Sequence, residues 1–144
     1  MLKRTLAIMA LMLGDTATSC LASAAIAVMP ASTVSTDSAA PTAFALAARV
    51  AARRGLTPFR APDQDEEAWN ACFTRETFFL CGKMYGREIQ FEMYQARTPR
   101  FTPWADSVRV ELLDSLRTRF GAPGVRECEW RISHAPPGSG CAPP

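Results

Sequence analysis

The feature that most constrains the fold is one stretch near the C-terminus, TPWADSVRVELLDSLRTRFGAP, which begins at Thr102 and indicates a single amphipathic helix. Thr102 can cap the first turn with its hydroxyl group, and Pro103 suits the first helical position, where no backbone N–H is needed. Gly121 and Pro123 follow as helix-ending residues. Apolar residues recur every three or four positions at Trp104, Val108, Leu112, Leu113, Leu116 and Phe120. This apolar face has to be buried, so we expect the helix to back a sheet.

The N-terminus has the organisation of an export signal. Two basic residues, Lys3 and Arg4, precede an apolar run over residues 6–13. Small residues then occupy two positions that a signal peptidase could read, Ala17-Thr18-Ser19 and Ala22-Ser23-Ala24. A basic segment, an apolar run and a small-residue cleavage site are the three parts of a secretory signal peptide.

We therefore assign residues 1–24 to an export signal, predict cleavage between residues 19 and 27, and expect a periplasmic or secreted protein. In one alternative, residues 17–20 form a degenerate lipobox and Cys20 carries the lipid of a bacterial lipoprotein. In another, the segment remains as a membrane anchor, although Asp15 would then lie in the bilayer at a cost of about 3 kcal/mol. We expect membrane contact only through the signal or a lipid anchor.

Beyond Cys20 the chain has four cysteines: Cys72, Cys81, Cys128 and Cys141. An even number of cysteines in an exported domain predicts disulfide bonds, and we predict Cys72 with Cys81 and Cys128 with Cys141. The alternative is a helix that runs unbroken to residue 80, in which case Cys128 and Cys141 each bond one of the other two. We expect no metal or cofactor, because the spacing lacks a C-x2-C pair and His134 is the single histidine.

The composition divides the chain into three further segments. Residues 25–62 are rich in Ala, Ser, Thr and Pro, which predicts a flexible linker with one marginal helix over 42–54. Residues 63–133 contain most of the aromatic side chains and are the predicted domain. Residues 134–144 form a Pro/Gly-rich tail.

Three segments of the predicted domain have the pattern of strands. Residues 77–85 are mainly apolar and aromatic, and residues 88–95 alternate, with Ile89, Phe91 and Met93 on one face. Residues 125–133 alternate with Cys128 on the inward side. A capping box at 63–66 predicts a short helix that buries Trp69, Cys72 and Phe73.

These elements predict a small single α+β domain with disulfide bonds. Its sheet would have three antiparallel or mixed strands, backed by one long amphipathic helix over about 103–120 and a shorter N-terminal helix.

The functional prediction is a non-enzymatic protein that binds another protein or a component of the cell envelope. The chain has no nucleotide or phosphate-loop motif, and its net charge of +2 implies no polyanionic partner such as nucleic acid. The alternative is a small secreted hydrolase that uses Glu127 and Glu129, about 7 Å apart on one strand, or His134. We assign no catalytic residue.

Overall fold

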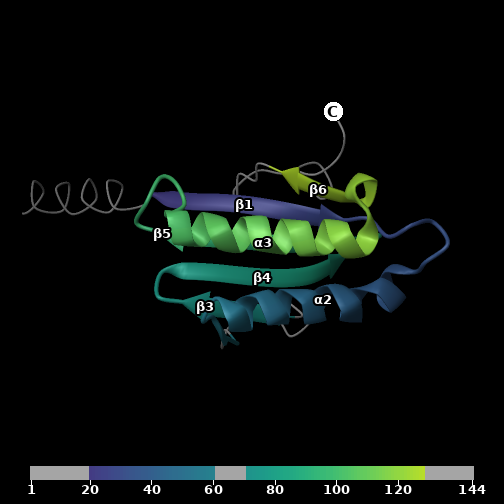
Figure 1. The fold of residues 1–144 in the computed structure, drawn as a ribbon, viewed down its shortest axis with the longest axis horizontal. Coiled ribbons are helices and arrows are strands. Elements are labelled where there is room, and N and C mark those ends of the chain that lie inside the picture. Colours follow the sequence, from purple (N-terminus) through teal and green to yellow (C-terminus); the bar gives the residue numbers. More distant parts are fainter. Residues whose placement is uncertain (1–19, 61–70, 129–144) are drawn as a thin grey trace, which may run out of the picture.

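The computed structural model describes residues 20–60 and 71–128. These residues form one antiparallel sheet of six strands in the order β2-β3-β4-β5-β1-β6, with two long helices on one face (Figure 1). The elements in chain order are β1 (Leu21–Val28), α2 (Thr36–Arg53), β2 (Thr57–Pro58), β3 (Ala71–Arg75), β4 (Phe78–Tyr85), β5 (Glu88–Ala96), α3 (Pro103–Phe120), the 3-10 turn η1 (Ala122–Gly124) and β6 (Val125–Cys128). The predicted α+β class and the antiparallel sheet are confirmed, but the sheet has six strands rather than three.

Helix α3 has the predicted start and end. The hydroxyl of Thr102 accepts a hydrogen bond from the backbone N–H of Ala105 at 3.4 Å, and Gly121 follows the helix with φ of 85°. Leu112 and Leu116 are fully buried against the sheet. The sequence therefore determines this element through local capping and a wide apolar stripe.

Helix α2 is as long as α3, and each has 18 residues. Ser35 caps it by accepting a hydrogen bond from the N–H of Ser38 at 3.1 Å. Its buried face consists mainly of alanines, namely Ala39, Ala40, Ala43, Ala47 and Ala51, together with Val50. Small side chains let a helix approach the sheet closely. Residues 42–54, for which the sequence predicts only a marginal helix in a linker, therefore belong to one of the two helices that cover the sheet.

Strand β1 lies inside the sheet, between β5 and β6. The expected boundary between an export signal and a linker, at residue 24, falls within this strand. Its residues Ile26 and Val28 are fully buried beneath the helices. Seven of the eight residues of β1 are apolar, and such a run resembles the apolar part of a signal peptide.

Strand β3 holds two residues that the capping-box prediction places on a helix, Cys72 and Phe73. Phe73 packs into the core, and Cys72 is paired directly with Cys81 of β4. These cysteines form the predicted disulfide, with their Cα atoms 4.1 Å apart. The link therefore joins two neighbouring strands instead of a helix and a strand.

Gly82 of β4 lies directly beneath Phe44 of α2 and beside Phe91 of β5. A Cβ atom at Gly82 would lie 2.8 Å from the ring of Phe91 and 3.0 Å from the ring of Phe44. The two rings pack edge to face with their centroids 6.0 Å apart. Glycine is therefore needed here to accommodate two aromatic side chains rather than to form a turn.

The sheet face turned away from the helices carries small, polar and aromatic residues, including Phe79 and Tyr94. Strand register places Cys128, Ala25, Glu92, Cys81 and Cys72 in one row across it. Cys128 is buried, as its predicted inward orientation requires. It packs with Ala25 and Ala27 on this second face of the sheet and not beneath the helices. Cys128 is also disulfide-bonded, and the predicted partner Cys141 lies outside the described residues.

Candidate functional site

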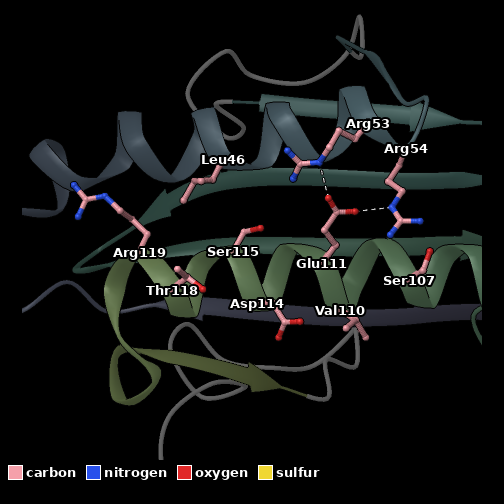
Figure 2. A pocket seen from close by; sticks show the side chains of 10 residues that line it. All are labelled: Leu46, Arg53, Arg54, Ser107, Val110, Glu111, Asp114, Ser115, Thr118 and Arg119. Atoms are coloured by element: carbon pink, nitrogen blue, oxygen red, sulfur yellow. Dashed lines mark hydrogen bonds and ion pairs between the residues drawn. The ribbon is translucent and has the colours of Figure 1, made fainter.

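A groove runs between α2 and α3 on the side of the helices away from the sheet (Figure 2). It has a volume of about 730 Å³ and polar as well as apolar walls. Helix α2 and the residue that follows it supply Leu46, Arg53 and Arg54, and α3 supplies Ser107, Val110, Glu111, Asp114, Ser115, Thr118 and Arg119. The groove is thus formed by two segments that are far apart in the sequence.

At one end of the groove, Glu111 is held by two arginines from the other helical segment (Figure 2). Its two carboxylate oxygens accept from Nε of Arg53 at 2.6 Å and from Nε of Arg54 at 2.5 Å. Burial by itself would raise the pKa of Glu111, but the hydrogen bonds and charges of Arg54 and Arg53 outweigh it and lower that pKa. Glu111 therefore remains ionised and fixes both guanidinium groups at the rim.

Both guanidinium groups keep donors available at this end. Within the described residues, Arg53 and Arg54 use only Nε in their ion pairs, so their terminal nitrogens make no hydrogen bond there. The side chain of Arg53 is 55% exposed. Two arginines share one carboxylate, so this end of the groove carries an excess positive charge.

The opposite end of the groove carries Arg119 (Figure 2). Arg119 lies eight positions after Glu111 on the same helix, which corresponds to about 12 Å along the axis. Its guanidinium carbon lies 5.7 Å from the centre of the Phe120 ring. Between the two cationic ends, Leu46 gives the groove an apolar side chain.

Glu127 forms an ion pair. It is the one candidate residue of the alternative hydrolase prediction that lies within the described residues. It lies on the helix side of β6 and pairs with Arg109 of α3, which also contacts Asp106 at 2.8 Å. Arg109 and Glu127 also line a second hollow, of about 420 Å³, near Phe101. The other two candidates, Glu129 and His134, lie outside the described residues.

A buried polar cluster occupies the other face of the sheet. Glu92 is 3% exposed, accepts a hydrogen bond from the hydroxyl of Tyr94, and lies 3.3 Å from Nζ of Lys83. The carboxylate therefore has a donor and a counter-charge, which is what a buried carboxylate needs for a structural role.

The remaining predicted positions add no further site in the described chain. Cys20 is a free, exposed cysteine directly before β1. Within residues 20–60 and 71–128, no group of three or more His, Cys, Asp or Glu side chains is placed to hold a metal ion. Neither described helix combines the length and apolarity that crossing a membrane requires.

The groove could not be predicted from the sequence because its key contact is not local. Arg53 and Glu111 are 58 positions apart, and no spacing rule connects residues on different helices at that distance. The available signal was the basic pair Arg53-Arg54 at the end of a helical pattern, which indicates cationic character but no partner.

Comparisons of the chain with protein-family models, with curated proteins and with solved structures find no match.

Proposed function

We propose that this chain is a small, exported, non-enzymatic protein, periplasmic or secreted, that binds an acidic segment of another protein in the α2–α3 groove. The export part is supported by the basic residues and apolar run at the N-terminus, and the Cys72–Cys81 disulfide is compatible with an oxidising compartment. The binding part is supported by one observation above all, the pair of fixed guanidinium groups of Arg53 and Arg54 at the rim of the groove.

Arginine pairs of this kind suit carboxylates. A guanidinium group can donate two parallel hydrogen bonds to a carboxylate, and charge-assisted bonds are shorter and stronger than neutral ones. Because Glu111 already orients Arg53 and Arg54, an incoming carboxylate would restrict less side-chain motion on binding than at a mobile arginine.

The length of the groove favours a segment with acidic residues near both of its ends. The Arg53–Arg54 end and Arg119 are separated by about 12 Å along α3, close to two turns of a helical partner. An apolar residue between the two carboxylates would contact Leu46. An amphipathic helix of a second protein fits this description, and helix-in-groove recognition is a common mode of peptide binding.

A membrane surface or another extended polyanion fits less well. The groove also contains Glu111 and Asp114, and like charges repel an extended negative surface. The net charge of the whole chain is only +2. A specific protein segment can place its carboxylates at the arginines and avoid these two acidic side chains, whereas a uniform anionic surface cannot.

A synthetic peptide tests the proposal on the full-length chain. The probe is a fluorescent helical peptide with two glutamates seven positions apart, about 10.5 Å along the axis, and a leucine between them on the same face. We expect the peptide to bind, and added salt to weaken binding. Combining Arg53→Gln, Arg54→Gln and Arg119→Gln should weaken it at least about tenfold, since one bond to a charged group contributes about 1.5–3 kcal/mol.

The matched control is Arg49→Gln, which removes an exposed arginine of α2 outside the groove and should leave binding unchanged. A second control is the same peptide with glutamines in place of its glutamates. Equal binding of the two peptides would refute the proposal. Binding to vesicles that contain anionic lipid, without binding to the acidic peptide, would identify an envelope component as the ligand instead.

A further inference from the structure

We infer that the mature protein retains strand β1 from its first residue, so that signal processing occurs at or before the Ser19–Cys20 bond and not after Ala24. This inference rests on the proposed export, and it chooses between the two peptidase sites that the sequence presents. It follows from the position of residues 20–24 in the sheet.

The hydrogen-bonded ladder of β1 begins at its N-terminal end. Leu21 pairs with Ala96 and Ala22 with Gln95, and the carbonyl of Cys20 accepts a hydrogen bond from the N–H of Arg97 at 2.9 Å. Cleavage after Ala24 would remove all of these partners. The backbone groups that they satisfy on β5 would then be left without their sheet partners.

The beginning of β1 also supports the start of α3. Ala22 is 4% exposed and lies beside Gln95, whose side chain accepts from the N–H of Thr102 at 2.9 Å and donates to its hydroxyl at 3.2 Å. Thr102 in turn caps α3. Loss of residues 21–24 would therefore expose the contact that fixes the beginning of the main helix.

Cleavage at the upstream site leaves this arrangement complete. The chain would then begin at Cys20, whose side chain is exposed and free while its backbone carbonyl accepts a hydrogen bond from Arg97, the residue after β5. Ala17-Thr18-Ser19 supplies the small residues for that cut. Of the two candidate sites, only this one preserves every pair of β1.

The test is the mass of the mature protein. The full chain, with its own N-terminus, is expressed in bacteria, fractionated into cytoplasm, periplasm and membranes, and measured by intact mass and N-terminal peptide mapping. We expect the folded exported protein to begin at Cys20 or earlier. A start at Cys20 supports the inference whether or not its thiol carries a lipid, and a folded protein that begins at Ala25 overturns it.

Failure of export is distinguishable from failure of this inference. An intact chain that begins with Met1 in the cytoplasm would refute export but leave β1 in place.

Substitutions within β1 give an independent measurement in the same full chain. A substitution in β1 can change the Tm of the mature protein only if the mature protein retains this strand. Ala22→Asp should lower Tm by at least about 5 °C, whereas Leu21→Asp, at a position 42% exposed, should change it much less. Equal Tm values for Ala22→Asp and the wild type would overturn the inference.

Discussion

Tyr94 donates a hydrogen bond to the carboxylate of Glu92, two positions earlier on the same face of β5. Burial raises the pKa of Tyr94 far above its ordinary value, and the hydrogen bond and negative charge of Glu92 raise it further. The ammonium group of Lys83 contacts the other carboxylate oxygen. The phenol is thus kept neutral so that it can donate to a buried anion.

Tyr94→Phe should destabilise the protein by about 1–3 kcal/mol, because it removes a donor from a buried carboxylate. The loss should depend on pH. An unfolded tyrosine ionises near pH 10 while the folded one stays protonated, so the wild type should lose stability as pH rises above about 10. The Tyr94→Phe variant has no phenol at this position, so it should not show the loss of folding stability above about pH 10 that Tyr94 causes.

Urea unfolding of both proteins from pH 8 to pH 11 measures this difference. Tyr85→Phe is the control, since the structure shows no hydrogen bond from the Tyr85 hydroxyl to a described residue. The same alkaline slope in Tyr94→Phe and the wild type would contradict the assignment.

Leu112→Ala and Leu116→Ala should each cost about 2–5 kcal/mol, because each leaves a cavity beneath α3 where the side chain is fully buried. Val110→Ala changes the same helix at a position that is 40% exposed, and it should cost within about 0.5 kcal/mol. Chemical denaturation gives all three values. A loss below about 0.5 kcal/mol at both leucines would mean that the apolar face of α3 is not the core.

Glu111→Gln should alter stability on the acid side. The pKa of Glu111 in the folded protein is lowered, so its stabilising effect is present above the unfolded value of about 4.3 and is lost as pH falls through the folded value. The free energy of unfolding should therefore differ between wild type and variant at pH 7, and the difference should shrink toward pH 2. The control is Asp114→Asn, an exposed groove carboxylate with no ion pair in the described chain. A difference independent of pH would contradict the ion-paired geometry.

A non-reducing peptide map should show one peptide that joins residues near 72 and 81, and we predict a second that joins Cys128 to Cys141. Breaking the first link, in a Cys72→Ala/Cys81→Ala variant, should cost about 3 kcal/mol for a loop of this length. Any peptide that joins residues near 72 or 81 to residues near 128 or 141 would show a different pairing.

The elements that could be predicted are those with complete local signals. Helix α3 has its cap, stripe and end within one stretch, and the β4–β5 hairpin has an alternating second strand after the turn at Gly86, where φ is positive. Helix α2 was underestimated because alanine contributes little burial per residue, and only the sheet beside Gly82 and Phe91 shows how closely it packs.

The elements that could not be predicted depend on contacts between distant parts of the chain. Residues 21–28 form an inner strand and are apolar except for Ser23, and a similar apolar run occurs in an export signal. Cys72 and Phe73 followed a convincing capping box, and tertiary pairing with β4 decided their conformation. The groove required Arg53 and Glu111 to meet across two helices.

The position of β1 also has a consequence for when the molecule can fold. Ala25 pairs with Cys128, so nearly all of the described chain must have been synthesised before the sheet can close. Sheets that join their first and last strands have high contact order and fold slowly. Until β5 and β6 have been synthesised, β1 has no sheet partner, so the two ends of the described chain must come together before the central part of the sheet can form.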